Sequence, residues 1–226
     1  MRLDGSSAER QIYRGVLAQR DGAARDEPRS LLGGENHRMG SLLVITGPPG
    51  AGKTTVASLV AKQTDPSVLI AGDAFFAFLA QGAIPPWLRE SQAQNEVVTR
   101  AAAAATGRFA ATYTTVYDGV IRPWSLPTFA TETGLEKFDY VILLPSVEEC
   151  LNRVMTREGH EFSEESATRK MHNEFHRAQI EQRHVLRDPP GTPGAVAREI
   201  LRRAAAGSLA HPASAPARCP RLPQSP

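Results

Sequence analysis

The chain has 226 residues, with 26 basic and 24 acidic side chains, 41% hydrophobic residues and two cysteines. No apolar run approaches the roughly 20 residues that a membrane-spanning helix needs, and the N-terminus lacks the apolar segment of a secretory signal. Cys150 and Cys219 have no metal-binding spacing. We therefore expect a cytoplasmic protein in a reducing compartment, without a membrane partner.

The two ends of the chain differ in composition from its middle. Residues 1–39 are rich in Arg, Asp, Gly and Ser without a sustained apolar period, and residues 207–226 are rich in Pro, Ala and Ser. Such segments bury too little apolar surface to offset the entropy lost on ordering. The sequence predicts disordered tails over 1–39 and 207–226 and a single domain over 40–206.

Strand and helix patterns alternate along this domain. Apolar, β-branched runs predict strands, and runs of helix formers between capping and stop residues predict helices. The expected strands are 41–46, 67–71, 113–117, 140–144 and 184–186. The expected helices are 54–62, a short one around 75–79, 91–106 (Ser91 as N-cap, Gly107 as stop), 146–157 (Ser146 as N-cap), 163–182 and 194–206. This alternation is typical of an α/β fold, with a parallel sheet of about five strands covered by helices on both faces.

Residues 47–54 read Gly-Pro-Pro-Gly-Ala-Gly-Lys-Thr, between the first expected strand and the first expected helix. This is the phosphate-loop pattern G-x-x-x-x-G-K-[ST], in which the lysine reaches the β and γ phosphates and the hydroxyl of the last residue holds Mg²⁺. Its glycines let successive amide groups point at one anion. The pattern predicts ATP and Mg²⁺ as cofactors. The residues expected to bind the nucleotide are Gly47, Pro48, Pro49, Gly50, Ala51, Gly52, Lys53, Thr54 and Thr55, with Lys53 also catalytic and Thr54 also on the metal.

Two aspartates follow the second and third expected strands, namely Asp73 and Asp118. The carboxyl ends of parallel strands meet at one edge of a sheet, where ligands bind. Phosphoryl transfer uses one carboxylate near the metal and one that accepts the proton of the attacking hydroxyl. An Asp in such a place can also be a turn former or helix cap. We favour Asp73 as the base and Asp118 as the metal or substrate partner.

The segment 153–177 alternates basic and acidic residues around a polar loop. Most of them, with Arg169 and Glu174 among them, are typical of a solvated pair of helices. Arg153 and Arg157, however, lie four residues apart on one helix just before the loop. A mobile helical lid that carries a cation over the transferring phosphate would need this arrangement. We expect Arg157 to be catalytic and Arg153 to bind the nucleotide.

The stretch 118–124 is too apolar for a purely solvated loop. Together with Phe75, Phe76, Trp87 and Phe129 it is a candidate lining for a small-molecule pocket. Packing in the core is the alternative, and we favour it for Phe75 and Phe76. Trp87 and Trp124, which lie beside prolines, are the better pocket residues.

Residues 41–206 resemble the small P-loop kinases in their phosphate loop, in Gly72-Asp73 and Asp118-Gly119 at strand ends, and in the Arg153…Arg157 helix before a polar loop. The nearest relatives by this resemblance are the chloramphenicol phosphotransferase-like and AAA-type ATP-binding proteins, with gluconate and shikimate kinases further away. The resemblance implies a P-loop NTPase fold with a helical lid, Asp73 as catalytic base and Arg157 as lid arginine. It places the adenine near Asp188–Gly191, although the prolines there depart from the usual pattern.

The leading hypothesis is an ATP-dependent kinase that phosphorylates a hydroxyl of a small molecule. One alternative is a kinase of the zeta-toxin or polynucleotide type. Outside the tails the chain has 17 basic and 18 acidic residues, which argues against a nucleic-acid partner because such domains usually carry a basic surplus. Another alternative is a regulatory ATPase without an acceptor. An Asn-Lys-x-Asp motif for guanine is absent from the sequence. The sequence leaves the acceptor and the oligomeric state open.

Overall fold

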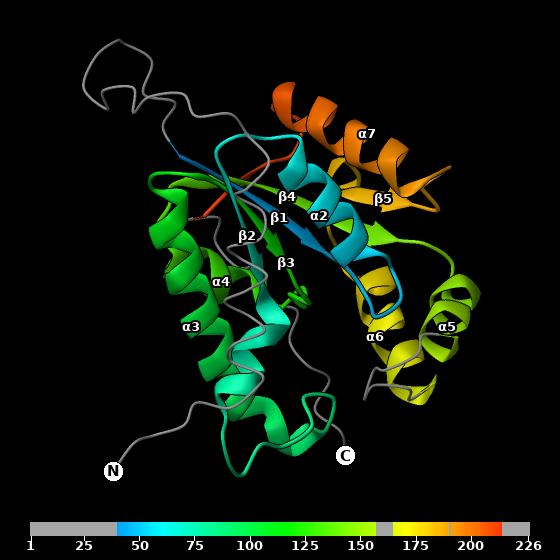
Figure 1. The fold of residues 1–226 in the computed structure, drawn as a ribbon. Helices are drawn as coiled ribbons and strands as arrows, with labels where there is room; N and C mark the ends of the chain where they lie inside the picture. The colour runs from blue at the N-terminus through cyan, green and yellow to red at the C-terminus, as the bar shows by residue number, and fades with distance from the viewer. Residues whose placement is uncertain (1–39, 157–164, 190, 214–226) are drawn as a thin grey trace, which may run out of the picture. The chain divides into compact units, whose positions relative to one another are not determined.

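The computed structural model describes residues 40–156, 165–189 and 191–213. Its centre is one sheet made of β1 (Ser41–Thr46), β2 (Ser67–Ala71), β3 (Thr114–Asp118), β4 (Lys137–Leu144), β5 (Val185–Arg187) and β6 (Ala210–Pro212). Five strands are parallel, in the order β2-β3-β1-β4-β5, and β6 pairs antiparallel with the start of β4 (Figure 1). The predicted parallel sheet of about five strands is confirmed, with one antiparallel strand added at β4.

Helices cover both faces of this sheet. They are α2 (Lys53–Lys62), α3 (Gln92–Ala110), α4 (Leu126–Thr133), α5 (Val147–Met155), α6 (Glu165–Arg177) and α7 (Pro193–Ala205), with 3₁₀ turns η1 (Gly72–Phe78), η2 (Arg89–Ser91) and η3 (Gln182–His184). Helices α2 and α7 pack together over one face, and α3 and α4 pack together over the other (Figure 1). Within the described parts of the chain, no helix is long and apolar enough to cross a membrane.

The alternation of side chains along β1 explains the two cores. Leu42 and Val44 point into the core beneath α3 and α4, whereas Leu43 and Ile45 point into the core beneath α2 and α7. Because successive residues of a strand face opposite sides, a central strand that is apolar throughout must be covered twice. This central strand leads directly into the phosphate loop, so both cores help to hold the loop in place.

Helix α3 begins where expected, directly after Ser91, but without the expected side-chain cap, and it ends later than expected, whereas the expected cap of α5 is confirmed. Ser91 has helical dihedral angles, so its hydroxyl does not cap α3 but donates to the carbonyls of Pro86 and Leu88. Helix α3 also runs through Gly107 to Ala110. A Cβ at Gly107 would lie 1.9 Å from the carbonyl oxygen of Thr133, so this glycine permits the close contact of α3 with α4. Ser146 does cap α5, as predicted, by accepting a hydrogen bond from the Glu149 amide.

Two elements did not appear in the sequence analysis. Helix α4 is short and holds Pro127 in its first turn together with several threonines, a composition with a weak helical signal. Strand β6 lies in the segment expected to be a tail. Leu209 is fully buried and β6 pairs with β4, so the domain boundary expected at 207 is wrong for residues 207–213. The predicted disorder of 1–39 and 214–226 concerns residues outside those that the structure describes.

Candidate active site

The phosphate loop connects β1 to α2 and is held by close backbone contacts. Gly47 and Gly50 have φ angles of 145° and 76°, in the region that favours glycine. A Cβ at either position would lie 2.2 Å from a carbonyl oxygen, that of Leu143 for Gly47 and that of Cys150 for Gly50. Side chains at these two positions would therefore push the loop away from β4 and α5. The loop's conformation is set by the strand and helix packed against it.

Helix α2 begins at the lysine of the loop and presents its N-terminal amides there. No acidic residue lies in its first turn, so nothing there opposes an anion. Lys53 is buried, and its Nζ donates to the carbonyl oxygen of Pro48 across the loop at 3.0 Å. The next two residues, Thr54 and Thr55, are exposed. The loop thus combines backbone amides, an ammonium group and accessible hydroxyls, the groups that bind a nucleotide's phosphates and its Mg²⁺.

The two predicted carboxylates lie at the same edge of the sheet. Asp118 is the buried last residue of β3 and is in register with Ile45 of β1, next to the start of the phosphate loop. Asp73 is exposed in η1, which follows β2. Burial raises the pKa of Tyr117, and the nearby carboxylates of Asp73 and Asp118 raise it further. Tyr117 therefore lies close to both aspartates, as expected if they serve one site.

Arg153 of α5 reaches the phosphate loop at Gly50, 103 residues away in the sequence. Its Nη1 donates to the carbonyl oxygen of Gly50 at 3.3 Å, and its other nitrogen is paired with Glu149. Burial raises the pKa of the neighbouring Cys150 thiol to about 11, while the positive charges of Lys53 and Arg153 act in the opposite direction. Lys53 and Arg153 thus each donate to a carbonyl oxygen of the phosphate loop. Arg157 lies outside the described residues, and the lid loop that follows it does too.

Charged residues of the segment 153–177 differ in their exposure and in their partners. Arg169 pairs with Glu165 on the exposed face of α6, as expected for a solvated helix. Glu174 does not fit that expectation, because its side chain is only 17% exposed and lies 3.9 Å from Arg122. The sequence analysis missed this contact. The alternation of acidic and basic residues along the sequence does not predict this contact, because the contact depends on how α6 packs against the loop after β3.

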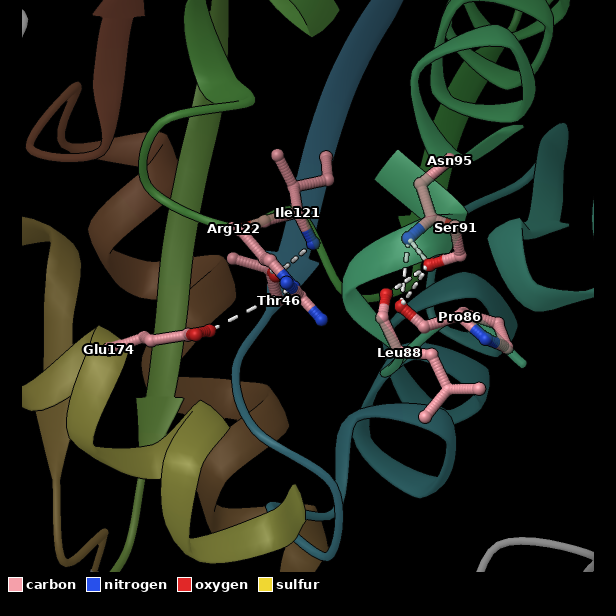
Figure 2. Close-up of polar contacts among 8 residues, drawn as sticks. All are labelled: Thr46, Pro86, Leu88, Ser91, Asn95, Ile121, Arg122 and Glu174. Atoms are coloured by element: carbon pink, nitrogen blue, oxygen red, sulfur yellow. Dashed lines mark hydrogen bonds and ion pairs between the residues drawn. The ribbon is translucent and has the colours of Figure 1, made fainter. Parts of the chain in front are cut away.

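The loop after β3 is tied to the end of β1 (Figure 2). The Ile121 amide donates to the hydroxyl of Thr46, and that hydroxyl lies 3.4 Å from the Ile121 carbonyl oxygen. Arg122 comes next, with its guanidinium 5.4 Å from the centre of the Trp124 ring. Thr46 is fully buried and precedes the phosphate loop directly. The geometry of this loop is therefore coupled to that of the phosphate loop.

The expected pocket residues divide between core and surface. Phe129 is fully buried in the core, so it is not a pocket residue, and Phe75 packs partly against the same core. Trp124 is half-exposed, and Trp87 is half-buried in the loop before α3. This loop is fastened to α3 by paired hydrogen bonds between Gln94 and Ile84 and by a bond from Asn95 to Pro86, the latter drawn in Figure 2.

The segment expected near the adenine follows β5. The Asp188 amide donates to the Leu144 carbonyl oxygen at 3.2 Å, which joins the ends of β5 and β4. Asp188 has a φ of 38°, a left-handed conformation that Asp tolerates better than most residues. The segment therefore begins at the same sheet edge as the phosphate loop. Pro190 lies outside the described residues, and adenine contacts remain a prediction.

The sequence of residues 46–171, more than half of the chain, matches the AAA domain family. The chain belongs to this family. A comparison with curated proteins gave no match. One similar solved structure is the tunicamycin resistance protein of Deinococcus radiodurans, with 20% sequence identity, a TM-score of 0.55, and coverage of 73% of this chain and 95% of that chain. Another is a gluconokinase from Sinorhizobium meliloti, with 20% identity, a TM-score of 0.53, and coverage of 76% of this chain and 95% of that chain. A third is shikimate kinase from Acinetobacter baumannii, with 18% identity, a TM-score of 0.50, and coverage of 76% of this chain and 97% of that chain.

These likenesses establish the fold, which is that of the P-loop kinases. At sequence identities near 20% they do not identify the substrate of this chain, because the loops that bind substrates vary freely among proteins that share a fold. The predicted resemblance of the chain to small P-loop kinases is confirmed at the level of the family and the fold.

Proposed function

We propose that this protein is an ATP-dependent kinase that transfers the γ-phosphate to a hydroxyl of a small molecule. The observation that carries the proposal is the arrangement at one sheet edge of a phosphate loop with Lys53 and two carboxylates, Asp73 and Asp118. A bare nucleotide-binding loop needs no exposed carboxylate beside it. A kinase needs one to receive the proton of its acceptor.

The residues fit Mg²⁺-ATP by their chemistry. The loop offers amides, and the first turn of α2 holds no acidic side chain. The Thr54 hydroxyl and the Asp118 carboxylate are oxygen ligands of the kind that Mg²⁺ prefers. When bound, Mg²⁺ neutralises charge on the β and γ phosphates. Gly47 to Thr55 would hold the phosphates. Arg153, already on the loop at Gly50, would add a second positive charge.

In the transfer itself, a bond forms between the acceptor oxygen and the γ-phosphorus while the bond from that phosphorus to the β–γ bridging oxygen breaks. Asp73 accepts the proton of the acceptor hydroxyl, and ADP leaves. Lys53 stabilises the charge that develops on the phosphates, and positioning by the loop supplies much of the remaining rate. Arg157 completes the set in this proposal as the cation of the lid.

The function is tested by measuring ADP formation from ATP in the presence of a panel of small hydroxyl compounds. We expect at least one compound to stimulate ADP formation and to be recovered phosphorylated. Equal, slow ADP formation with every compound would contradict the proposal and favour a regulatory ATPase. Stimulation by an oligonucleotide end alone would instead favour a polynucleotide-type kinase.

Lys53→Met tests the phosphate loop within the same assay. Methionine keeps the buried stem of the side chain and removes the charge, so the domain should still fold. Loss of a preorganised cation at a transferring phosphate should lower the maximal rate at least about 100-fold. Lys62→Met, in the exposed last turn of the same helix, is the matched control and should be close to wild type.

A further inference from the structure

The loop after β3 leaves the sheet between the turn that carries Asp73 and the phosphate loop. In the strand order, β3 lies between β2, which leads to Asp73, and β1, which leads to the phosphate loop. The carboxyl ends of these parallel strands meet at one edge of the sheet. An acceptor hydroxyl has to reach both its base and the γ-phosphate. The position of the loop after β3 therefore helps to set the separation between these two groups.

Tyr117 fills the space between this loop and the turn of Asp73. Gly72 precedes Asp73, and a Cβ there would lie 2.2 Å from the hydroxyl oxygen of Tyr117. A Cβ at Gly119, the first residue of the loop, would lie 3.0 Å from the same atom. The Tyr117 ring is packed edge-on against the buried ring of Phe129, with the ring centres 4.8 Å apart. The backbones on both sides thus lie against one side chain that the core holds in place.

Thr46 fastens the loop after β3 to the start of the phosphate loop (Figure 2). Thr46 is fully buried, ends β1 and directly precedes the phosphate loop. Its hydroxyl accepts from the Ile121 amide at 2.8 Å and donates to the Ile121 carbonyl oxygen at 3.4 Å. A backbone bond from the Gly119 amide to the Ile45 carbonyl oxygen is also 3.4 Å long. The shortest of these three bonds therefore depends on the Thr46 hydroxyl.

The phosphate loop itself has ties that do not involve Thr46. Nζ of Lys53 donates to the Pro48 carbonyl oxygen, and Nη1 of Arg153 donates to the Gly50 carbonyl oxygen. Loss of the Thr46 hydroxyl should therefore displace the loop after β3 and leave the phosphate loop in place.

We propose that Thr46 is a positioning residue for phosphoryl transfer, because it holds the loop after β3 through Ile121 and so fixes the turn of Asp73 relative to the phosphate loop. This inference rests on the proposed kinase function and adds to it a fully buried residue that acts through a loop. Transfer between two bound groups is sensitive to their alignment, and a displacement of about 1 Å can cost about 100-fold in rate.

The test compares Thr46→Val with Thr46→Ser in the ADP-formation assay with the full-length protein and an acceptor from the panel. Valine keeps the shape but places a methyl group against the Ile121 amide, and a carbon atom needs about 3.5–4.0 Å where the hydroxyl oxygen lies at 2.8 Å. We expect kcat/KM for the acceptor to fall about 10- to 100-fold in Thr46→Val, with an unchanged dissociation constant for ATP. Thr46→Ser keeps the hydroxyl and should restore most of kcat/KM.

Thr133→Val is the matched control. Thr133 is also buried, and its hydroxyl donates to the Ala130 carbonyl oxygen at 2.7 Å and accepts from the Leu135 amide at 3.4 Å. It ends α4 shortly before β4 begins, at the edge of the sheet opposite to the phosphate loop. Thr133→Val should lower the melting temperature and leave kcat/KM for the acceptor at the wild-type value.

A purely structural role of Thr46 would give a different result. Thr46→Val would then lower the melting temperature and leave kcat/KM for the acceptor unchanged, which would overturn the inference. Loss of ATP affinity in Thr46→Val would overturn it too, because the phosphate loop itself would then have moved. Should Thr46→Val fail to fold, Thr46→Ala removes the same hydroxyl without the added methyl contact, and an unchanged kcat/KM in that variant would again overturn the inference.

Failure of the kinase function is distinguished by the wild-type protein. If no compound stimulates its ADP formation, the kinase function fails, and a role of Thr46 in transfer fails with it. If a compound stimulates the wild type and Thr46→Val equally, the kinase function stands and only the role of Thr46 is overturned.

Discussion

At the scale of single residues, Asp73 and Asp118 differ in environment although both lie at the carboxyl end of a strand, Asp118 as the last residue of β3 and Asp73 in η1 after β2. Asp73 is exposed, whereas Asp118 is buried beside β1. An exposed carboxylate can receive a proton from a substrate and pass it to water, whereas a buried one beside the phosphate loop suits a fixed ligand. This difference supports the division of roles that the sequence favoured, which stays a proposal.

We expect Asp73→Asn to lower the maximal rate about 10²- to 10⁴-fold, because the amide cannot accept the proton of the acceptor. The dissociation constant for Mg²⁺-ATP should stay near the wild-type value when measured by calorimetry. Glu90→Gln, an exposed acid in η2, is the control. A collapse of Mg²⁺-ATP affinity with an unchanged saturating rate would make Asp73 a metal residue instead.

At the scale of elements, the close approach of α3 and α4 depends on one position. Gly107 lies inside α3, where glycine is normally unfavourable, and its missing side chain makes room for the Thr133 carbonyl. Helix α3 also anchors the loop before it through Gln94 and Asn95. Helix α3 thus contacts both α4 and the loop before it.

We expect Gly107→Ala to destabilise the domain by about 1–3 kcal/mol, because the new Cβ would lie 1.9 Å from a backbone oxygen and would force the helices apart. Thermal unfolding followed by circular dichroism measures the change. Gly194→Ala in the first turn of α7 is the control, since its Cβ would meet only atoms 3.6 Å or more away. Equal melting temperatures for the two variants would show that the helices yield without cost.

Strand β6 contributes a histidine to an aromatic cluster at the start of β4. His211 contacts the rings of Phe138, Tyr140 and His184. His184 donates from Nδ1–H to the Tyr140 carbonyl oxygen at 2.9 Å. Burial lowers the pKa of both histidines, and the charge of Arg183 lowers both further, whereas Glu181 opposes this.

This cluster predicts acid sensitivity. Because the folded-state pKa of each histidine lies below its ordinary value of 6.5, the folded form prefers both neutral, and their contribution to stability is complete above that pH. The contribution is lost as the pH falls through 6.5 toward the lowered folded-state values. His211→Phe keeps an aromatic ring and removes one titration, so its melting temperature should fall less between pH 7.5 and pH 5. An identical pH dependence in the variant would contradict this explanation.

At the scale of the whole molecule, the segment 207–213 adds the antiparallel strand β6 to the sheet beside β4. Leu209 is fully buried in the core beneath α2 and α7, and its carbonyl oxygen accepts from the Tyr140 amide. The segment thus belongs to the domain, against the expectation from its composition.

Deletion of residues 208–226 should therefore lower the free energy of unfolding by at least about 2–5 kcal/mol, the cost of truncating a buried leucine, and lower the melting temperature with it. Deletion of 214–226 leaves every contact described here in place and is the comparison. Thermal unfolding of the two shortened proteins measures the difference. Equal stability of both would mean that β6 adds nothing to the fold.

The sequence by itself determined the features that depend on neighbouring residues. The phosphate loop spans eight consecutive positions, and its glycines and lysine are specified by local backbone geometry and charge. The apolar pattern of β1 likewise predicted a strand buried on both faces, because burial repeats with the period of the strand.

Only the tertiary structure decided which distant residues meet. Arg153 reaches Gly50, Glu174 faces Arg122, and Leu209 lies in the core although it belongs to a segment whose prolines and alanines predict a tail. The physical reason is that a local sequence pattern reflects backbone preference and average burial, whereas these contacts depend on how α5, α6 and β6 pack against the rest of the domain. Gly107 shows the same limit, because its sequence neighbours predict a helix end and only the packing of α4 explains why the helix continues.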